Sequence, residues 1–90
     1  MKTDFRNNSD GEYAMISVSP REKVQIMLRR NGLTNVWLAG QLEKRGITTD
    51  NTELSRFLSG KRVGDKATRV ITESMLILTK YERLFAADVS

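Results

Sequence analysis

The 90-residue sequence contains no cysteine and no histidine. Without thiols, the chain can form neither a disulfide framework nor a thiolate metal site. Without imidazole, it lacks the commonest metal ligand and the most frequent general base of enzymes. Both absences argue against an enzyme, and nothing in the sequence calls for a metal or another cofactor.

Long apolar runs are missing as well. No stretch approaches the roughly 20 apolar residues that a membrane-spanning helix needs, and residues 1–20 lack the apolar centre of a signal peptide. We therefore expect a cytoplasmic protein with no membrane partner. A chain of 90 residues suffices for one small domain and not for two.

The net charge is +4, and most of the positive charge lies in the middle of the chain. Residues 21–69 hold eleven Lys and Arg against five Asp and Glu, whereas residues 1–20 and residues 70–90 each hold two against three. A concentrated basic segment fits phosphate neutralisation and counterion release on a nucleic acid. Many soluble domains that bind nothing anionic carry a similar excess, so the charge alone decides little.

Capping residues predict two helices in the first half of the chain. Residues 19–22, Ser-Pro-Arg-Glu, combine a capping box with a proline in the first turn. The helix that they begin should run to about Asn31. Thr34 is a candidate N-cap for a second helix. Gly46 should end that helix, because glycine adopts the left-handed conformation of a helix end without steric cost.

Two further helices are predicted in the second half. Asp50 and Glu53 have the spacing of another capping box, which places a helix start at residue 51. A cationic loop with two glycines follows over residues 59–66. Asp65 is the expected cap of a long helix over about residues 66–85.

Apolar residues at helical spacing give each of the first three helices one buried face. The expected core residues are Val24, Met27 and Leu28, then Trp37, Leu38 and Leu42, and then Leu54, Phe57 and Leu58. We therefore predict an all-α fold for residues 19–87, a compact bundle of four to five helices. Its second and third helices would form a helix-turn-helix with an extended turn, and a long C-terminal helix would follow.

Residues 1–18 are expected to be a flexible leader, because most of them follow no helical or strand period. Residues 13–18 alternate in a way that would suit a short extended segment. Lys2 and Arg6 are candidates for a DNA-contacting arm, but the negative net charge of the leader argues against that role.

The helix predicted after Asp50 has a short polar outer face. Its residues are Asn51, Thr52, Ser55, Arg56 and Ser59. In the major groove of DNA, Arg can bond to O6 and N7 of guanine, and Asn can bond to N6 and N7 of adenine. The ordinary alternative is a solvated helix face, and a polar stripe taken alone is more often that.

The pattern of the whole central stretch points further. Leu38-Ala39, Leu42, Gly46-Ile47, residues 54–58 (Leu-Ser-Arg-Phe-Leu) and residues 60–62 (Gly-Lys-Arg) together resemble the phage repressor and Cro type of helix-turn-helix, the lambda-repressor-like family. The resemblance covers roughly residues 21–78. The turn is longer than in the common form of the family, because residues 43–45 separate Leu42 from Gly46.

The resemblance implies double-stranded DNA as the partner. Carried over by position, it implies base reading by Asn51, Thr52, Ser55 and Arg56, and phosphate contacts by Thr34, Asn35, Lys61 and Arg62. Lys66, in the same cationic loop, is a further candidate for a phosphate contact, which would fix register without reading sequence.

The C-terminal helix has more apolar surface than one face of a small core needs. We predict that its first part packs on the other helices and that its end meets a second copy of the chain. The expected dimer residues are Ile77, Tyr81, Leu84 and Phe85. The alternative is that the leader folds over this surface. In a dimer, two recognition helices would enter successive major grooves about 34 Å apart.

Three functional classes follow. The first is a sequence-specific transcription regulator, a small repressor or Cro-like switch protein of phage or mobile-element type, that occupies an operator as a dimer. The second is an excisionase-like or architectural DNA-binding accessory factor. The third is an antirepressor-type module that uses the helix-turn-helix scaffold to bind another protein.

Overall fold

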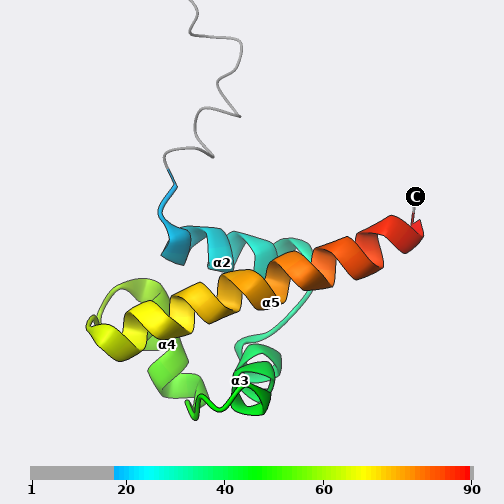
Figure 1. Ribbon diagram of the computed structural model, residues 1–90. Helices are drawn as coiled ribbons and strands as arrows, with labels where there is room; N and C mark the ends of the chain where they lie inside the picture. The colour runs from blue at the N-terminus through cyan, green and yellow to red at the C-terminus, as the bar shows by residue number, and fades with distance from the viewer. Residues whose placement is uncertain (1–17, 90) are drawn as a thin grey trace, which may run out of the picture.

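The computed structural model describes residues 18–89, with side-chain detail through residue 85. Its four helices are α2 (Pro20–Arg30), α3 (Asn35–Lys44), α4 (Asn51–Ser59) and α5 (Asp65–Val89) (Figure 1). No strand occurs within that described range. The predicted all-α bundle is therefore confirmed. The leader lies outside the described residues except for Val18, and so do Lys2, Arg6 and residues 13–17 of the predicted extended segment.

The starts of α2 and α3 are fixed by the side chains that the sequence predicted. At the start of α2 the N–H of Ser19 donates to Oε1 of Glu22 at 3.2 Å, and the N–H of Glu22 donates to Oγ of Ser19 at 3.3 Å. This reciprocal pair is a complete capping box. At the start of α3, Oγ1 of Thr34 accepts from the N–H of Trp37 at 3.1 Å.

The start of α4 corrects one detail of the sequence analysis. Oδ1 of Asp50 accepts from the N–H of Glu53 at 2.7 Å, as a cap should. The Glu53 carboxylate does not return to the backbone of Asp50, so the predicted second capping box is only half formed. It accepts instead from Oγ1 of Thr49 at 2.8 Å and from Nζ of Lys66 at 3.0 Å, because the loop before α5 brings that ammonium group close.

The turn between α3 and α4 is held by backbone hydrogen bonds around Gly46. The N–H of Gly46 donates to the carbonyl oxygen of Glu43 at 2.9 Å, and the N–H of Ile47 donates to that of Leu42 at 3.0 Å. This pair of bonds requires a left-handed residue, and Gly46 has φ of 85°. Ile47 is buried in the core, so residues 45–50 form a packed turn that is longer than the usual 3–4 residues, roughly, of a helix-turn-helix.

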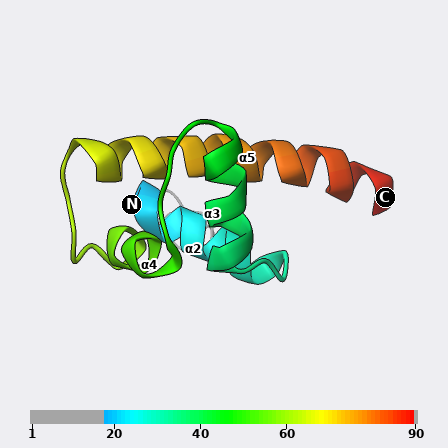
Figure 2. The same cartoon turned by 90° about the horizontal axis from the view of Figure 1, so that it is seen from below.

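The long helix α5 lies along one side of the other three helices (Figure 2). It begins at Asp65, one residue earlier than predicted. The N–H of Thr68 bonds to the carbonyl oxygen of Gly64 at 3.0 Å, so Asp65 is the first residue of α5 and not its cap. It ends at Val89 and so continues past the predicted end near residue 85. Its C-terminal part projects beyond α2 and α3 (Figure 1).

The core lies between α5 and the layer of α2, α3 and α4. Its buried apolar residues are Val24, Met27, Leu28, Leu38, Leu42, Ile47, Leu54, Phe57, Leu58, Ala67, Val70, Ile77 and Leu78. The apolar faces predicted for the first three helices are all present, although Trp37 is only half-buried. Ser74 of α5 is fully buried among them, and its hydroxyl has no hydrogen-bond partner in the described part of the chain.

Candidate nucleic-acid interface

The outer side of α4 carries the residues predicted to read bases. Leu54, Phe57 and Leu58 turn into the core, so the opposite side of the helix faces outward. That side exposes Asn51, Thr52, Ser55, Arg56 and Ser59. Together with Lys61, these residues line an open concavity of about 380 Å³, which we name the α4 concavity. The structure therefore brings the four predicted base-reading residues onto one surface.

A second open concavity, of about 330 Å³, lies where α2 and α3 meet α4, and we name it the α2/α3 concavity. It shares Ser55 and Ser59 with the α4 concavity, so the two flank one ridge. Asn35, the first residue of α3, lines it. The N-terminus of a helix offers unpaired N–H groups and a partial positive charge, which favour a phosphate oxygen.

Two residues that line the α2/α3 concavity, Gln25 and Arg29, are not indicated as site residues by the sequence pattern. Both lie on α2, whose sequence pattern indicates only a packing helix. Nε2 of Gln25 donates to the carbonyl oxygen of Leu58, one of the carbonyl groups that the end of α4 leaves without an intrahelical partner. Arg29 reaches this surface because α2 packs on α4, and no local pattern in the sequence encodes that contact.

Lys61 and Arg62 are held at the end of α4 by the backbone. Their N–H groups donate to the carbonyl oxygen of Arg56 at 3.0 and 3.2 Å. The bonds depend on Gly60, which has φ of 82°. A Cβ atom at Gly60 would also lie 3.1 Å from the guanidinium carbon of Arg21. The side chains of Lys61 and Arg62 are both exposed. Lys61 lines the α4 concavity, whereas Arg62 lines neither concavity.

Thr34 and Lys66, the other predicted phosphate contacts, already have partners within the fold. The Thr34 oxygen caps α3 through the N–H of Trp37, and its hydroxyl hydrogen can still be donated to a ligand. Lys66 forms an ion pair with Glu53 at 3.0 Å. The pKa of the Glu53 carboxyl is lowered, first by its hydrogen bond with Lys66 and then by that with Thr49. Lys66 lines neither concavity, and its charge is largely offset.

The charge balance of the two concavities favours an anion. They are lined by Arg29, Arg56 and Lys61, and neither is lined by an Asp or a Glu. Asp50 precedes the first residue of α4 and is exposed, but its Oδ1 accepts from the N–H of Glu53. Because α4 contributes side chains that can both donate and accept hydrogen bonds, the surface can make directional contacts to base edges as well as charge contacts to phosphates.

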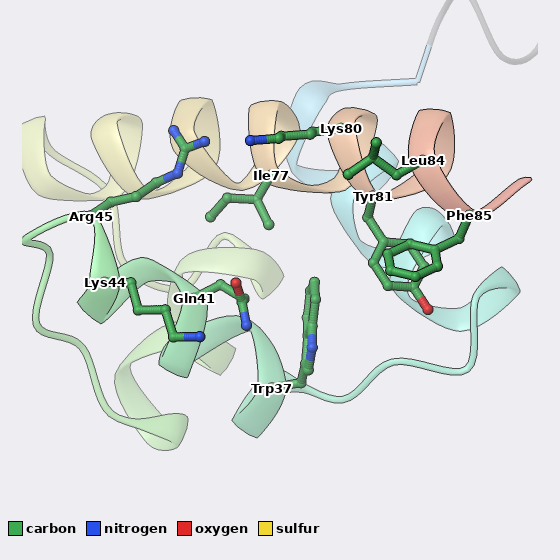
Figure 3. Close-up of a pocket in the computed structure, with 9 residues that line it drawn as sticks. All are labelled: Trp37, Gln41, Lys44, Arg45, Ile77, Lys80, Tyr81, Leu84 and Phe85. Carbon is green, nitrogen blue, oxygen red and sulfur yellow. The ribbon is translucent and has the colours of Figure 1, made fainter. Parts of the chain in front are cut away.

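The residues predicted at a dimer interface lie elsewhere, between α3 and the C-terminal half of α5. Ile77 is only 7% exposed and belongs to the core, so it has little surface to offer a partner. Tyr81, Leu84 and Phe85 line an open groove with Trp37 (Figure 3). The Trp37 and Tyr81 rings meet edge to face with centroids 5.4 Å apart.

A charged cluster fixes the C-terminal half of α5 against the end of α2. The guanidinium group of Arg30 donates to both carboxylate oxygens of Glu82 at 2.6 and 2.7 Å, and Nδ2 of Asn31 donates to the same carboxylate at 2.6 Å. The Arg30 hydrogen bond is the main reason that the pKa of Glu82 is lowered, and it raises the pKa of Arg30. Arg30 therefore helps to orient α5.

No family model, curated protein or solved structure matches the chain. Within residues 18–89, no helix is long and apolar enough to cross a membrane. The same range contains no cluster of three or more acidic side chains that could hold a metal ion. The resemblance to the phage repressor and Cro type of helix-turn-helix accordingly rests on the sequence pattern.

Proposed function

We propose that the chain is a sequence-specific DNA-binding regulator that reads the major groove with the outer face of α4. The observation that carries the proposal is the grouping of Asn51, Thr52, Ser55 and Arg56 on one exposed helix face, with cations beside it and no acid lining either concavity. A duplex carries a phosphate charge about every 1.7 Å, so a surface with this charge balance gains affinity by releasing counterions.

The arrangement of the neighbouring helices supports the same proposed function. The ridge of Ser55 and Ser59 is made of short side chains, which permit a close approach of α4 to base edges. On one side of the ridge stand Asn35 and Arg29, and on the other stands Lys61. Phosphate contacts on both sides of a helix fix its depth and register in the groove, whereas contacts from the helix itself discriminate between bases.

The proposal requires one domain per half-site and assigns different roles to Arg56 and Lys61. Replacing Arg56 by Ala should weaken binding to the preferred duplex by about 1–3 kcal/mol and relax the preference at one base pair. Replacing Lys61 by Ala should weaken binding to all duplexes alike and make the dependence of log K on log salt shallower by about one unit.

Fluorescence anisotropy with a labelled duplex, chosen by selection from a randomised pool, measures both effects. Arg83→Ala is the matched control, because Arg83 is an exposed cation on the C-terminal half of α5 and lines neither concavity. It should bind as the unmodified chain does. If Arg56→Ala bound every duplex as tightly as the unmodified chain, α4 would not be the reading helix.

The predicted dimer is independent of this assignment and stays a prediction. Sedimentation velocity at tens of micromolar tests it. A chain that stays monomeric and binds a single half-site with full affinity would refute it.

A further inference from the structure

The groove between α3 and the C-terminal half of α5 is a second surface that DNA binding by α4 does not use. We name it the α3/α5 groove. It has a volume of about 410 Å³ and is lined by Trp37, Gln41, Lys44, Arg45, Ile77, Lys80, Tyr81, Leu84 and Phe85 (Figure 3). It forms because the apolar stripe of α5 that packs on the core continues past the end of the other helices.

The apolar part of the α3/α5 groove is exposed. Leu84 and Phe85 are each 53% exposed. The Phe85 ring lies against that of Tyr81 with centroids 4.5 Å apart, and Tyr81 in turn meets Trp37. Exposed apolar side chains that are contiguous, rather than scattered singly, mark interaction surfaces.

The charges around the groove have one sign. Lys44, Arg45 and Lys80 line it, and no Asp or Glu does. Arg45 is paired with Glu73 at 2.6 Å. Among the described residues, Lys44 and Lys80 form no ion pair. Figure 3 shows the aromatic rings at one end of the groove and the three cationic groups towards the other.

This charge pattern selects among the occupants of the groove. A second copy of the chain related by a two-fold axis would present the same groove, which has no Asp or Glu in its lining, and so would leave Lys44 and Lys80 without a counter-charge. A small ligand would remain largely in water, because small-molecule sites usually enclose roughly 70–90% of the ligand. An amphipathic helix with an acidic flank is complementary to both ends of the groove. Its apolar anchors cover the aromatic rings, and its carboxylates pair with the two lysines.

We propose that the α3/α5 groove binds an acidic amphipathic helix of a partner protein. The partner helix presents aliphatic or aromatic anchors at positions i, i+3 or i+4, and i+7, with Asp and Glu beside them. Figures 1 and 2 place α4 and the C-terminal end of α5 on opposite sides of α3. The groove therefore stays open when α4 is occupied, and the proposal does not depend on DNA binding.

Peptide display on the full chain tests the proposal without a known partner. The probe is a phage library of randomised peptides of about 16 residues, long enough for several helical turns. We expect enrichment of apolar residues at helical spacing together with Asp and Glu. An enriched peptide should change the emission of Trp37, the one tryptophan of the chain, because Trp37 lines the groove.

Two variants locate the binding site. The double variant Lys44→Glu/Lys80→Glu should bind the enriched peptide at least about tenfold more weakly, because two attractions become repulsions. Leu84→Ser should weaken it similarly through the lost apolar contact, and circular dichroism would verify that this half-exposed substitution leaves the fold intact. Lys61→Glu/Arg62→Glu is the matched control, since it reverses two charges outside the groove and should leave the peptide affinity unchanged.

Several results would overturn the proposal. The first is a library from which no peptide is enriched, and the second is enrichment of neutral or basic peptides. The third is a loss of peptide affinity in the control variant equal to that in Lys44→Glu/Lys80→Glu, which would indicate unspecific charge attraction. Sedimentation of the chain alone provides a further test. If the chain dimerised and Leu84→Ser abolished the dimer, a second copy would occupy the groove in place of a partner helix.

Discussion

Replacing Ser74 by Ala should make the protein more stable. Ser74 is fully buried between Val70 and Leu78, one turn away on either side, and both of these are also fully buried. Its hydroxyl has no hydrogen-bond partner among the described residues. A buried hydroxyl without a partner costs about 1–3 kcal/mol. Alanine also has the higher helix propensity, by up to about 0.5 kcal/mol.

One opposing effect reduces the gain. Removing the oxygen atom leaves a void and forfeits its packing contacts, which for a single heavy atom costs about 0.5–1.5 kcal/mol. The balance is a stabilisation of about 1 kcal/mol. With an m-value of about 1 kcal/mol/M, as small proteins show in urea, the midpoint of unfolding should rise by about 1 M at unchanged m.

Urea titration followed by the fluorescence of Trp37 and by far-ultraviolet circular dichroism measures this shift. Thr79→Ala is the control, because Thr79 lies on the same helix and is exposed, so that its replacement changes helix propensity alone. The excess of Ser74→Ala over Thr79→Ala is the net contribution of the buried hydroxyl, which is its desolvation cost less its packing contacts. If Ser74→Ala lowered the midpoint, the hydroxyl would have a partner that stabilises the fold, and the reasoning would be wrong.

Two further substitutions test the turn and the charged cluster. Gly46→Ala should destabilise the fold by about 1–2 kcal/mol. The reason is backbone strain alone, because φ at Gly46 is 85° and an added Cβ atom would meet nothing within 4 Å. An unchanged urea midpoint would contradict the left-handed turn. Glu82→Gln should cost roughly 1 kcal/mol at pH 7 by weakening the contacts to Arg30. Because the folded pKa of Glu82 is depressed, its contribution is present above the unfolded pKa of about 4.3 and is lost as the pH falls through the lower folded value. The stability difference between Glu82→Gln and the unmodified chain should accordingly shrink below about pH 4, and a difference that stays constant down to pH 2 would refute the ion pair.

The starts of α2, α3 and α4 were predictable because capping is local. Ser19 and Thr34 each bond to a backbone N–H three residues on, so the residues that define the start of a helix lie within one turn of it in the sequence. The left-handed turn at Gly46 was equally predictable, since a left-handed residue at a helix end is most often glycine. The apolar periodicity then assigned the buried face of each helix, and the core of the structure follows that assignment.

Contacts between distant parts of the chain were not predictable in this way. Glu53 pairs with Lys66, and Arg30 pairs with Glu82. No periodicity links such positions, because their distance depends on how the helices pack. Ile77 illustrates the same limit. Its position on α5 allows both a core role and an interface role, and only the extent to which α3 covers α5 places it in the core.

The candidate interface was predictable in part. The polar face of α4 follows directly from the apolar spacing of Leu54, Phe57 and Leu58, since the remaining positions of a short helix must point outward. The contribution of Arg29 was missed because it depends on the packing of α2. The partnership of Lys66 with Glu53 was missed for the same reason, and it weakens the case for Lys66 as a phosphate contact.

Selection from a pool of randomised duplexes at fixed, moderate salt tests the central claim most directly. We expect an enriched sequence whose preference relaxes at one base pair when Arg56 is replaced by Ala, since that side chain is the one arginine of the proposed reading face. Weak, salt-sensitive retention with no enriched sequence would contradict it. In that case the outer face of α4 would be an ordinary polar surface or a contact for another protein.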